Sequence, residues 1–353
     1  MATDDTLSHA KPSTRNVQHV VLGNLRFQTW YQSIYPEDLV SKETDTLYVC
    51  RWCFRYACDV NTHATHTKLC PHRTTPPGTK VYDHGGYSVW EVDGADHKLF
   101  GQNLSLFAKL FVDHKSVFFD VVSFLYYILV FTDPNDPDKS YHILGFFSKE
   151  KLSWDANNLA CILVFPPYQR KQLGKLLMGV SYKLSGWEQD SSRIGGPERP
   201  LSEMGRKSYG RFWEERIARY LVLLSSNTTT AGESEDTKTQ KSSSAKGPRK
   251  KITHELMTVQ EIGLATGMLT EDIITTLRSL GVVEPASPSK TRKGASAESE
   301  AVPLVVRRSK VLDWAKSSNV NLRDPVRDEG FLLNHLSAGV VRETASPGSD
   351  DDE

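Results

Sequence analysis

The chain has 353 residues, of which 39% are hydrophobic and 24% are charged, as expected of a globular protein with one large domain or two smaller ones. Lys and Arg total 43, and Asp and Glu also total 43, so the zero net charge argues against bulk electrostatic binding to nucleic acid. No apolar run reaches the roughly 18 residues needed to span a membrane, and the polar N-terminus lacks the apolar centre of a signal peptide, so we expect an intracellular protein with no membrane partner.

The first two segments are a short polar tail and a lobe rich in cysteine and histidine. Residues 1–17 are polar and predict disorder. Residues 18–85 predict an N-terminal lobe, and four of the five cysteines lie between positions 50 and 70 within it. An odd number of clustered cysteines beside histidines favours a metal site in a reducing compartment over a disulfide framework.

The cluster has the spacing of a zinc site. Cys50-x2-Cys53 is followed after twelve residues by His66 and after three more by Cys70, which supplies the four tetrahedral ligands that Zn²⁺ prefers. Because four protein ligands leave no open coordination position, we expect a structural zinc whose binding contributes folding free energy. Neighbours that remain alternative ligands are Cys58, His63 and His72.

Residues 86–225 are the densest hydrophobic region and predict an α/β core. The run at residues 159–165 is continuously apolar, which predicts a central strand covered on both faces. The expected elements are, in chain order, a strand at 87–92, a helix at 103–113, strands at 122–131, 141–148 and 159–165, and helices at 170–184 and from 202 toward 224.

The rest of the chain alternates between polar segments and helical patterns. Residues 226–251 predict a disordered insertion because they are rich in Ser, Thr and Lys. Residues 252–340 predict a C-terminal helical lobe with a disordered linker near 285–300, and residues 341–353 form an acidic tail. Two short amphipathic helices split near Gly267 are similar to a helix-turn-helix.

The strand at 159–165 leads into its helix through a short turn that can hold phosphate. The start of a helix presents free backbone N–H groups and the positive end of the helix dipole, which suit a pyrophosphate. Arg170, Lys171 and Lys175 add positive charge there. The same pattern is typical of an ordinary α/β crossover, so the turn alone leaves both interpretations open.

Successive blocks of the sequence resemble the MYST histone acetyltransferases. CILVFPPYQRKQLGKLL resembles their acetyl-CoA motif, whose loop usually reads Q/R-x-x-G-x-G/A. Gln172 replaces the first glycine of that motif and Gly174 remains, so we expect the Gln172 N–H to stay available if φ is negative and CoA binding to weaken otherwise. Further matching blocks follow in family order within residues 29–224: DTLYVCRWC, PPGTKVY, NLSLFAKLFVDHKSVFFDV, HILGFFSKEK, GGPERPLSEMG and SYGRFWEERI.

The resemblance implies a mixed α/β fold: a GNAT-like acetyl-CoA-binding core with an N-terminal C2HC zinc finger lobe and a C-terminal helix-turn-helix-like lobe. It implies that Glu198 is the general base, that Cys161 is the active-site cysteine and that Lys115 is autoacetylated. The cofactor-binding residues that it implies are Ile162, Leu163, Val164, Arg170, Lys171, Gln172, Leu173, Gly174, Lys175 and Ser202.

The chemistry of acetyl transfer to lysine fits these residue types. A lysine amine with a pKa of about 10.4 is protonated at neutral pH, so a carboxylate must remove its proton before attack on a thioester. Partial burial of Glu198 would raise the pKa of its carboxyl toward the working range. Direct attack needs only Glu198 and correct positioning, so we expect Cys161 to support the wall of the site. Ser202 is also a predicted helix N-cap, because Glu203 and an amphipathic run follow it.

The implied partners are histone tails of the nucleosome and the subunits of a multiprotein acetyltransferase complex, in the nucleus. The short length and the lack of a chromodomain-like segment resemble the small fungal silencing-associated, SAS-like branch, which implies nucleosomal histone four. By resemblance the helix-turn-helix-like region frames the substrate cleft. That role ranks above nonspecific DNA contact by the basic residues 246–251, and both rank above sequence-specific DNA recognition.

Two other classes of protein remain open. The first is a catalytically weak chromatin-binding subunit that keeps the acetyltransferase fold, which the glutamine at position 172 motivates. The second is a zinc-finger transcription factor that uses the helix-turn-helix, which explains neither the loop nor the long apolar core.

Overall fold

The computed structural model describes residues 15–136, 140–153, 155, 157–188, 194–230, 256–285 and 304–332. The chain divides into two compact units, the first made of Met1–Trp154, Leu159–Leu177 and Arg327–Glu353 and the second of Asp155–Asn158 and Met178–Val326. Most of the predicted disordered tail and insertion, the predicted linker and the acidic tail lie outside the described residues. Within the described part of the chain, no helix is long and apolar enough to cross a membrane.

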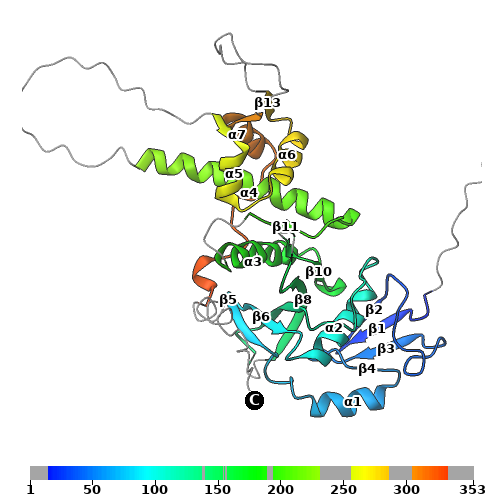
Figure 1. Ribbon diagram of the computed structural model, residues 1–353. Helices are drawn as coiled ribbons and strands as arrows, with labels where there is room; N and C mark the ends of the chain where they lie inside the picture. The colour runs from blue at the N-terminus through cyan, green and yellow to red at the C-terminus, as the bar shows by residue number, and fades with distance from the viewer. Residues whose placement is uncertain are drawn as a thin grey trace, which may run out of the picture. The chain divides into compact units, whose positions relative to one another are not determined.

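The first unit begins with a small sheet that supports a helix (Figure 1). Its strand order is β2-β1-β3-β4, with β1 parallel to β3 and antiparallel to β2. Alternate residues of β1 and β3 are buried, as expected for strands with one face on a core. The elements are β1 (His19–Leu22), β2 (Leu25–Gln28), β3 (Thr46–Val49), β4 (Tyr56–Ala57) and α1 (Val60–Leu69).

A five-stranded antiparallel sheet of order β10-β8-β7-β6-β5 forms the centre of the first unit. Helix α2 (Lys98–Lys109) packs against one face of this sheet, where Ser105 Oγ lies 3.1 Å from the buried Tyr126 hydroxyl. Near the C-terminal end of the described chain, η2 (Asp328–Gly330) leads to Leu332, whose N–H donates to the carbonyl of Val81 in β5. The strands are β5 (Thr79–His84), β6 (Tyr87–Asp93), β7 (Phe124–Thr132), β8 (Tyr141–Glu150) and β10 (Cys161–Val164).

The apolar run at residues 159–165 is an edge strand and not the predicted central one. It is split between β9 (Asn157–Leu159) and β10, and β10 pairs only with β8 within the sheet. Leu163 is buried, but Ile162 and Val164 are half-buried. The prediction was wrong because an apolar run reports how deeply side chains are buried and not how many strands flank the backbone.

Three predicted helices exist with shifted ends. Helix α2 begins five residues earlier and ends four residues earlier than the predicted 103–113. Helix α3 (Leu173–Glu188) follows η1 (Pro166–Tyr168) and begins three residues later than predicted, because Arg170 and Gln172 have positive φ angles of 64° and 63°. Helix α4 (Glu203–Thr230) continues through the first residues of the predicted disordered insertion. A polar composition does not end a helix that a buried apolar face has already begun further back.

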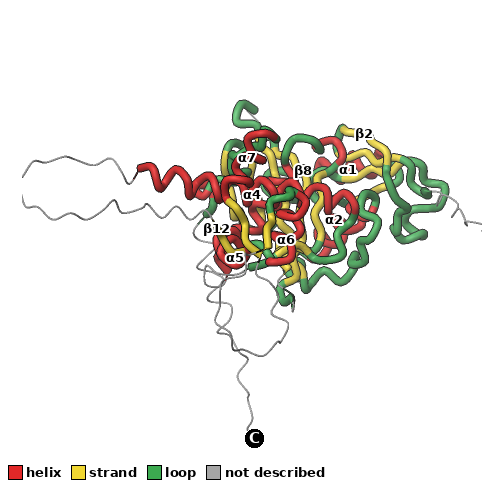
Figure 2. Tube along the Cα trace, turned by 90° about the horizontal axis from the view of Figure 1, so that it is seen from above, coloured by secondary structure: helices red, strands yellow, loops and turns green. Residues whose placement is uncertain are grey.

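The second unit contains the predicted pair of short helices together with strands that the sequence did not predict. Helices α5 (Val259–Thr266) and α6 (Thr270–Ser279) meet at Gly267, which has a φ of 69°, so the predicted break is confirmed. With α7 (Arg308–Ser317), they lie against α4 (Figure 2). The strands are β12 (Leu256–Thr258), β13 (Val283–Pro285) and β14 (Leu304–Arg307), in the order β12-β14-β13, and β11 (Gly196–Pro197), which pairs with β9.

Candidate functional site

The four predicted zinc ligands converge in the first unit. The Sγ atoms of Cys50, Cys53 and Cys70 and a ring nitrogen of His66 all lie within 4.8 Å of one another. A tight turn sets the first pair, since the Phe54 N–H donates to the Cys50 carbonyl at 3.0 Å. Helix α1 carries His66 near its end, and Cys70 follows as its C-cap. Three thiols and an imidazole at these distances are a donor set that fits tetrahedral Zn²⁺.

The three alternative ligands lie outside this cluster. Cys58 is exposed, and its Sγ lies 3.3 Å from the Leu39 carbonyl. The His63 ring packs against Tyr48 with ring centroids 5.9 Å apart, and the His72 ring packs against Phe100. Among the residues that the structure describes, the Cys50, Cys53, His66 and Cys70 set is the one grouping of this kind.

The thiols of the cluster perturb one another. A hydrogen bond between the Cys50 and Cys53 side chains lowers the pKa of Cys50 to about 5 and raises the pKa of Cys53. Zn²⁺ binds cysteine as the thiolate, so an ion would remove the competition for a proton that drives these opposite shifts.

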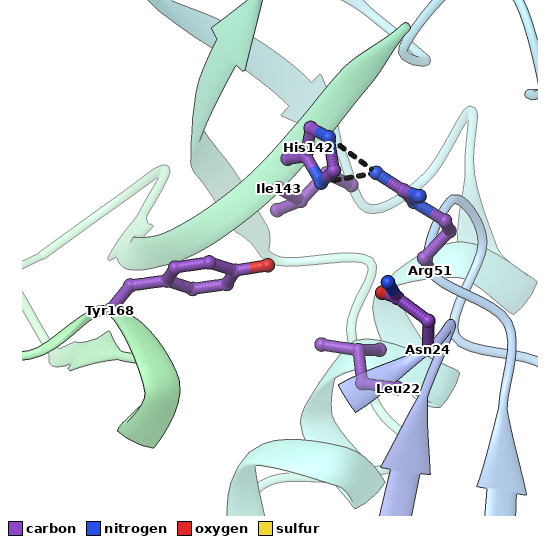
Figure 3. Close-up of a pocket in the computed structure, with 6 residues that line it drawn as sticks. All are labelled: Leu22, Asn24, Arg51, His142, Ile143 and Tyr168. Carbon is purple, nitrogen blue, oxygen red and sulfur yellow. Dashed lines mark hydrogen bonds between the residues drawn. The ribbon is translucent and has the colours of Figure 1, made fainter. Parts of the chain in front are cut away.

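Both ends of the zinc motif are tied to the start of β8. The Arg51 guanidinium donates to the ring of His142 and to the Tyr141 carbonyl, and the Tyr141 hydroxyl donates to the His72 carbonyl. Figure 3 shows Arg51, His142 and the Tyr168 hydroxyl around one small pocket. Burial and then the Arg51 charge lower the pKa of His142, so the ring is a neutral acceptor at physiological pH. The sequence did not predict this joint, because no local pattern pairs Arg51 with a histidine 91 positions away.

The edge of β10 is open to a ligand with amide groups. The Phe165 N–H donates to the Leu144 carbonyl of β8, so by the alternation of a strand the main-chain groups of Ile162 and Val164 point the other way. The Gln169 side chain already donates to the Val164 carbonyl at 2.8 Å. No other strand of this sheet lies beyond β10 within the described residues, so Ile162 presents its N–H and carbonyl at a free edge.

The turn before α3 has the geometry of an anion cradle. Arg170 and Gln172 adopt left-handed backbone conformations around Lys171, an arrangement that turns successive N–H groups toward one side. These three residues are exposed, and their N–H groups donate to no oxygen within the described part of the chain. A Cβ added to Gly174 would meet no atom within 4 Å, so nothing inside the protein demands a glycine there. A glycine without an internal reason fits close approach of a ligand to the backbone.

From the sequence, CoA binding is expected to weaken unless the φ angle of Gln172 is negative. The observed φ is +63°, so weaker CoA binding is the expected case. We expect Gln172→Gly to stabilise the fold by about 1 kcal/mol, because a non-glycine residue in this region costs roughly 1–2 kcal/mol. We also expect CoA to bind several-fold more tightly. Thermal unfolding and calorimetric titration with CoA measure the two effects.

Lys171→Gly is the matched control for the stability effect, because Lys171 has no positive φ. Glycine there should lower the unfolding temperature by increasing the backbone entropy of the unfolded chain. A Gln172→Gly protein that is no more stable than the wild type would show that the left-handed turn carries no strain.

Cys161 lies on the face of the sheet that α2 covers. It pairs with Ser148 across β8, and Ser148 pairs with Tyr126 of β7, so the three side chains share one face. Burial raises the pKa of Tyr126 to about 12, and the nearby Cys161 thiol contributes to this increase. Cys161 is half-buried against the main apolar core, a position that fits a wall residue.

Glu198 and Ser202 belong to the second unit. Both are exposed, so the partial burial that would raise the pKa of the Glu198 carboxyl is not observed. Ser202 caps α4 as predicted, because its Oγ accepts from the Gly205 N–H at 3.0 Å. Lys115 belongs to the first unit and is half-buried in the segment between α2 and β7.

Most of the chain is similar to proteins of one family. The model of the MOZ/SAS family matches residues 75–310, and that of the MYST family zinc finger domain matches residues 14–70. The chain is 37% identical over 266 residues to the histone acetyltransferase Tip60 homolog of Caenorhabditis elegans, covering 75% of this chain and 51% of that protein. It is 37% identical over 286 residues to the histone acetyltransferase MOF of Drosophila melanogaster, covering 80% of this chain and 30% of that protein.

A plant relative is matched to a similar extent. The chain is 36% identical over 270 residues to the putative MYST-like histone acetyltransferase 1 of rice, Oryza sativa subsp. japonica, covering 76% of this chain and 51% of the relative. The chain therefore spans about half or less of the length of these relatives.

Proposed function

This chain belongs to the MOZ/SAS family and carries the MYST zinc finger, and from that membership we propose that it is a protein-lysine acetyltransferase acting on histone tails. Acetyl-CoA is its acetyl donor, and Zn²⁺ at Cys50, Cys53, His66 and Cys70 has a structural role. The relatives named above are histone acetyltransferases, which supports the substrate class.

One observation carries the proposal: the turn from Arg170 to Gly174 has a geometry that fits a phosphorylated ligand. It combines exposed N–H groups in a left-handed arrangement, the start of a helix and a glycine that faces open space. Arg170, Lys171 and Lys175 supply positive charge to a pyrophosphate, and the free edge of β10 supplies main-chain partners for the amides of pantetheine.

In the proposed reaction Glu198 removes a proton from the ammonium group of the substrate lysine. The neutral amine attacks the thioester carbonyl, a C–N bond forms and the C–S bond breaks. The nitrogen loses a second proton, which goes to the sulfur, so CoA leaves as the thiol. The carboxylate is the right type of base, because the amine alone is mostly protonated at neutral pH. Ser202 is a cofactor-binding residue in this proposal. It lies at the start of α4, where its hydroxyl is oriented because it accepts from the Gly205 N–H.

The direct test is transfer of a labelled acetyl group from acetyl-CoA to histone tails by the purified, zinc-loaded chain. We expect label on lysine and stoichiometric release of CoA. Histones in which the tail lysines are acetylated beforehand serve as the control substrate and should accept no label. Tight CoA binding without transfer to any histone would contradict the enzyme and support the chromatin-binding alternative.

Cys161→Ala is expected to retain acetyl transfer, with kcat reduced less than about tenfold. A wall residue changes packing, whereas loss of a nucleophile removes a covalent step and costs orders of magnitude. Steady-state kinetics and a search for an acetylated cysteine by mass spectrometry of the quenched enzyme provide the measurement. Abolished turnover together with an acetyl-cysteine in the wild type would assign Cys161 the nucleophilic role instead.

The finer assignments are part of the same proposal. We place the protein in the nucleus, in a multiprotein complex that acts on nucleosomal histone four, with Lys115 as an autoacetylated residue. The family membership and the histone acetyltransferase relatives support a chromatin role. Peptide mapping of Lys115 and of the modified histones tests these assignments directly.

The transcription-factor alternative is disfavoured by the charge of α6. In a helix-turn-helix the first residues of the second helix contact the bases. Here the first turn of α6 carries Glu271 and Asp272, and Asp272 is buried. The exposed Glu271 repels DNA phosphates and the buried Asp272 cannot reach a base, so α6 is unsuited to enter the major groove.

A further inference from the structure

The segment of residues 194–200, which carries Glu198, is seated on the turn between α5 and α6. The Gly195 N–H donates to the Gly267 carbonyl at 3.0 Å, and Gly195 forms a β-bridge with Met268. Gly196 lies so close to α6 that a Cβ there would be 2.8 Å from Leu269 Cδ1 and 3.0 Å from Asp272 Oδ2. A larger residue there would displace the side chain of Leu269 or Asp272, so the backbone just before Glu198 lies in close contact with the start of α6.

A charged pair fixes the same segment on the other side of Glu198. The Arg199 guanidinium donates to Oδ1 of Asp272. The Asp272 side chain is 2% exposed, whereas that of Arg199 is 45% exposed. Glu198 therefore lies between two neighbours, Gly196 and Arg199, that both contact the first turn of α6.

Among the residues that the structure describes, Arg199 is the cation paired with Asp272. Tyr182 of α3 and Tyr209 of α4 are buried close to its carboxylate, and Glu271 is the adjacent acid on α6. Oδ2 of Asp272 and Oγ1 of Thr276 are buried without a hydrogen-bond partner among the described residues. A buried ion pair of this kind contributes little net stability, because desolvation offsets the attraction. A contribution to the free energy of unfolding therefore does not explain why the Arg199–Asp272 pair lies beside the proposed base.

We propose that Asp272 is a positioning residue for acetyl transfer, which fixes Glu198 through the Arg199 contact. The proposal rests on Glu198 being the general base, as argued above. In this proposal the α5–α6 turn holds the segment of residues 194–200 in place. The proposal requires no ligand on α6. The start of α6 is then occupied by the chain's own residues 194–200.

The test compares Asp272→Asn with Glu271→Gln in the zinc-loaded full chain. Each change removes one negative charge from the first turn of α6, but Glu271 is exposed and has no contact with Arg199 among the described residues. Amide hydrogen exchange in a peptide covering residues 194–200 should rise in Asp272→Asn and stay at the wild-type level in Glu271→Gln. The kcat for acetyl transfer should fall by roughly 10- to 100-fold in Asp272→Asn alone, because small misplacements of a reacting group have effects of this size. The KM for acetyl-CoA should remain within about twofold.

The pH profile separates positioning from general loosening of the fold. Asp272→Asn leaves the Arg199 charge uncompensated beside Glu198, so the acid limb of kcat/KM should move to lower pH. Arg199→Gln leaves the Asp272 charge instead, so the acid limb should move to higher pH. Arg199→Lys keeps the positive charge and should restore most of the wild-type rate and profile.

Three results would overturn the proposal. The first is unchanged exchange of residues 194–200 in Asp272→Asn, and the second is increased exchange with unchanged kcat. The third is an acid limb that moves in neither variant. If Asp272→Asn does not fold, as judged by circular dichroism, Arg199→Gln carries the test because its side chain is half-exposed. A wild-type protein without acetyl transfer but with the expected exchange pattern would refute the proposed function and leave the anchoring contact intact.

Discussion

Replacement of Cys50 by serine is expected to unfold the zinc lobe, with a loss of most of the free energy of zinc binding. Structural zinc in comparable small modules contributes about 10–16 kcal/mol at neutral pH, which exceeds the whole stability of most domains. Cys50 is fully buried and its neighbour Phe54 packs on three other phenylalanine rings, so loss of the ion leaves the core of the lobe without its support. Zinc content by atomic absorption and thermal unfolding with and without a chelator measure the effect.

Cys58→Ser is the matched control for Cys50→Ser. Both replace a thiol by a hydroxyl in the same lobe, but Cys58 is exposed and lies outside the ligand cluster. It should keep one zinc per chain and the wild-type unfolding temperature. Equal zinc loss in both variants, or full zinc content in Cys50→Ser, would contradict the ligand assignment.

Loss of zinc should also disturb the turn from Arg170 to Gly174, which is proposed to bind CoA. Arg51 and His72 flank the zinc ligands and are tied to Tyr141 and His142 at the start of β8, and Tyr168 of η1 lines the same pocket two residues before Arg170 (Figure 3). These contacts all lie within the first unit. A chelated protein is therefore expected to lose CoA affinity along with stability.

The zinc ligands could be predicted from the sequence because coordination chemistry imposes its own spacing on the chain. Cys50, Cys53, His66 and Cys70 must place four donors on one ion, and few spacings allow this. Strands β7 and β8 were predictable for a related reason, since long apolar segments bounded by turn residues leave few alternatives. In these cases residues close together in the sequence are enough to determine the structure.

The features that escaped the sequence depend on partners far along the chain or on backbone angles. Arg199 and Asp272 are 73 positions apart, and neither residue type reveals that it will pair. The edge position of β10 depends on the order of strands in the sheet, which side-chain hydrophobicity does not encode. The sequence left the sign of φ at Gln172 open, and the structure shows that the glutamine adopts a φ of 63°.

Replacement of Glu198 by glutamine is expected to lower kcat for acetyl transfer by about 100- to 10,000-fold, the usual contribution of a positioned general base. This corresponds to about 3–5.5 kcal/mol of barrier, at 1.36 kcal/mol for each factor of ten. Glutamine has nearly the shape of glutamate but takes no proton. Affinity for CoA and the unfolding temperature should therefore stay close to wild type, because Glu198 is exposed and lies apart in the sequence from the cofactor turn.

The pH dependence gives this prediction its sharpest form. Without a base, only substrate lysine that is already neutral can react, and that fraction grows about tenfold per pH unit below a pKa of about 10.4. The residual rate of Glu198→Gln should therefore rise steadily with pH, whereas the wild-type rate levels off once the carboxylate is ionised. Glu203→Gln is the matched control, since Glu203 is exposed and pairs with Lys207 at 2.7 Å on the outer surface of α4. It should keep the wild-type rate and profile. A Glu198→Gln enzyme with wild-type kcat, or with a rate that levels off at the same pH as the wild type, would show that another group removes the proton.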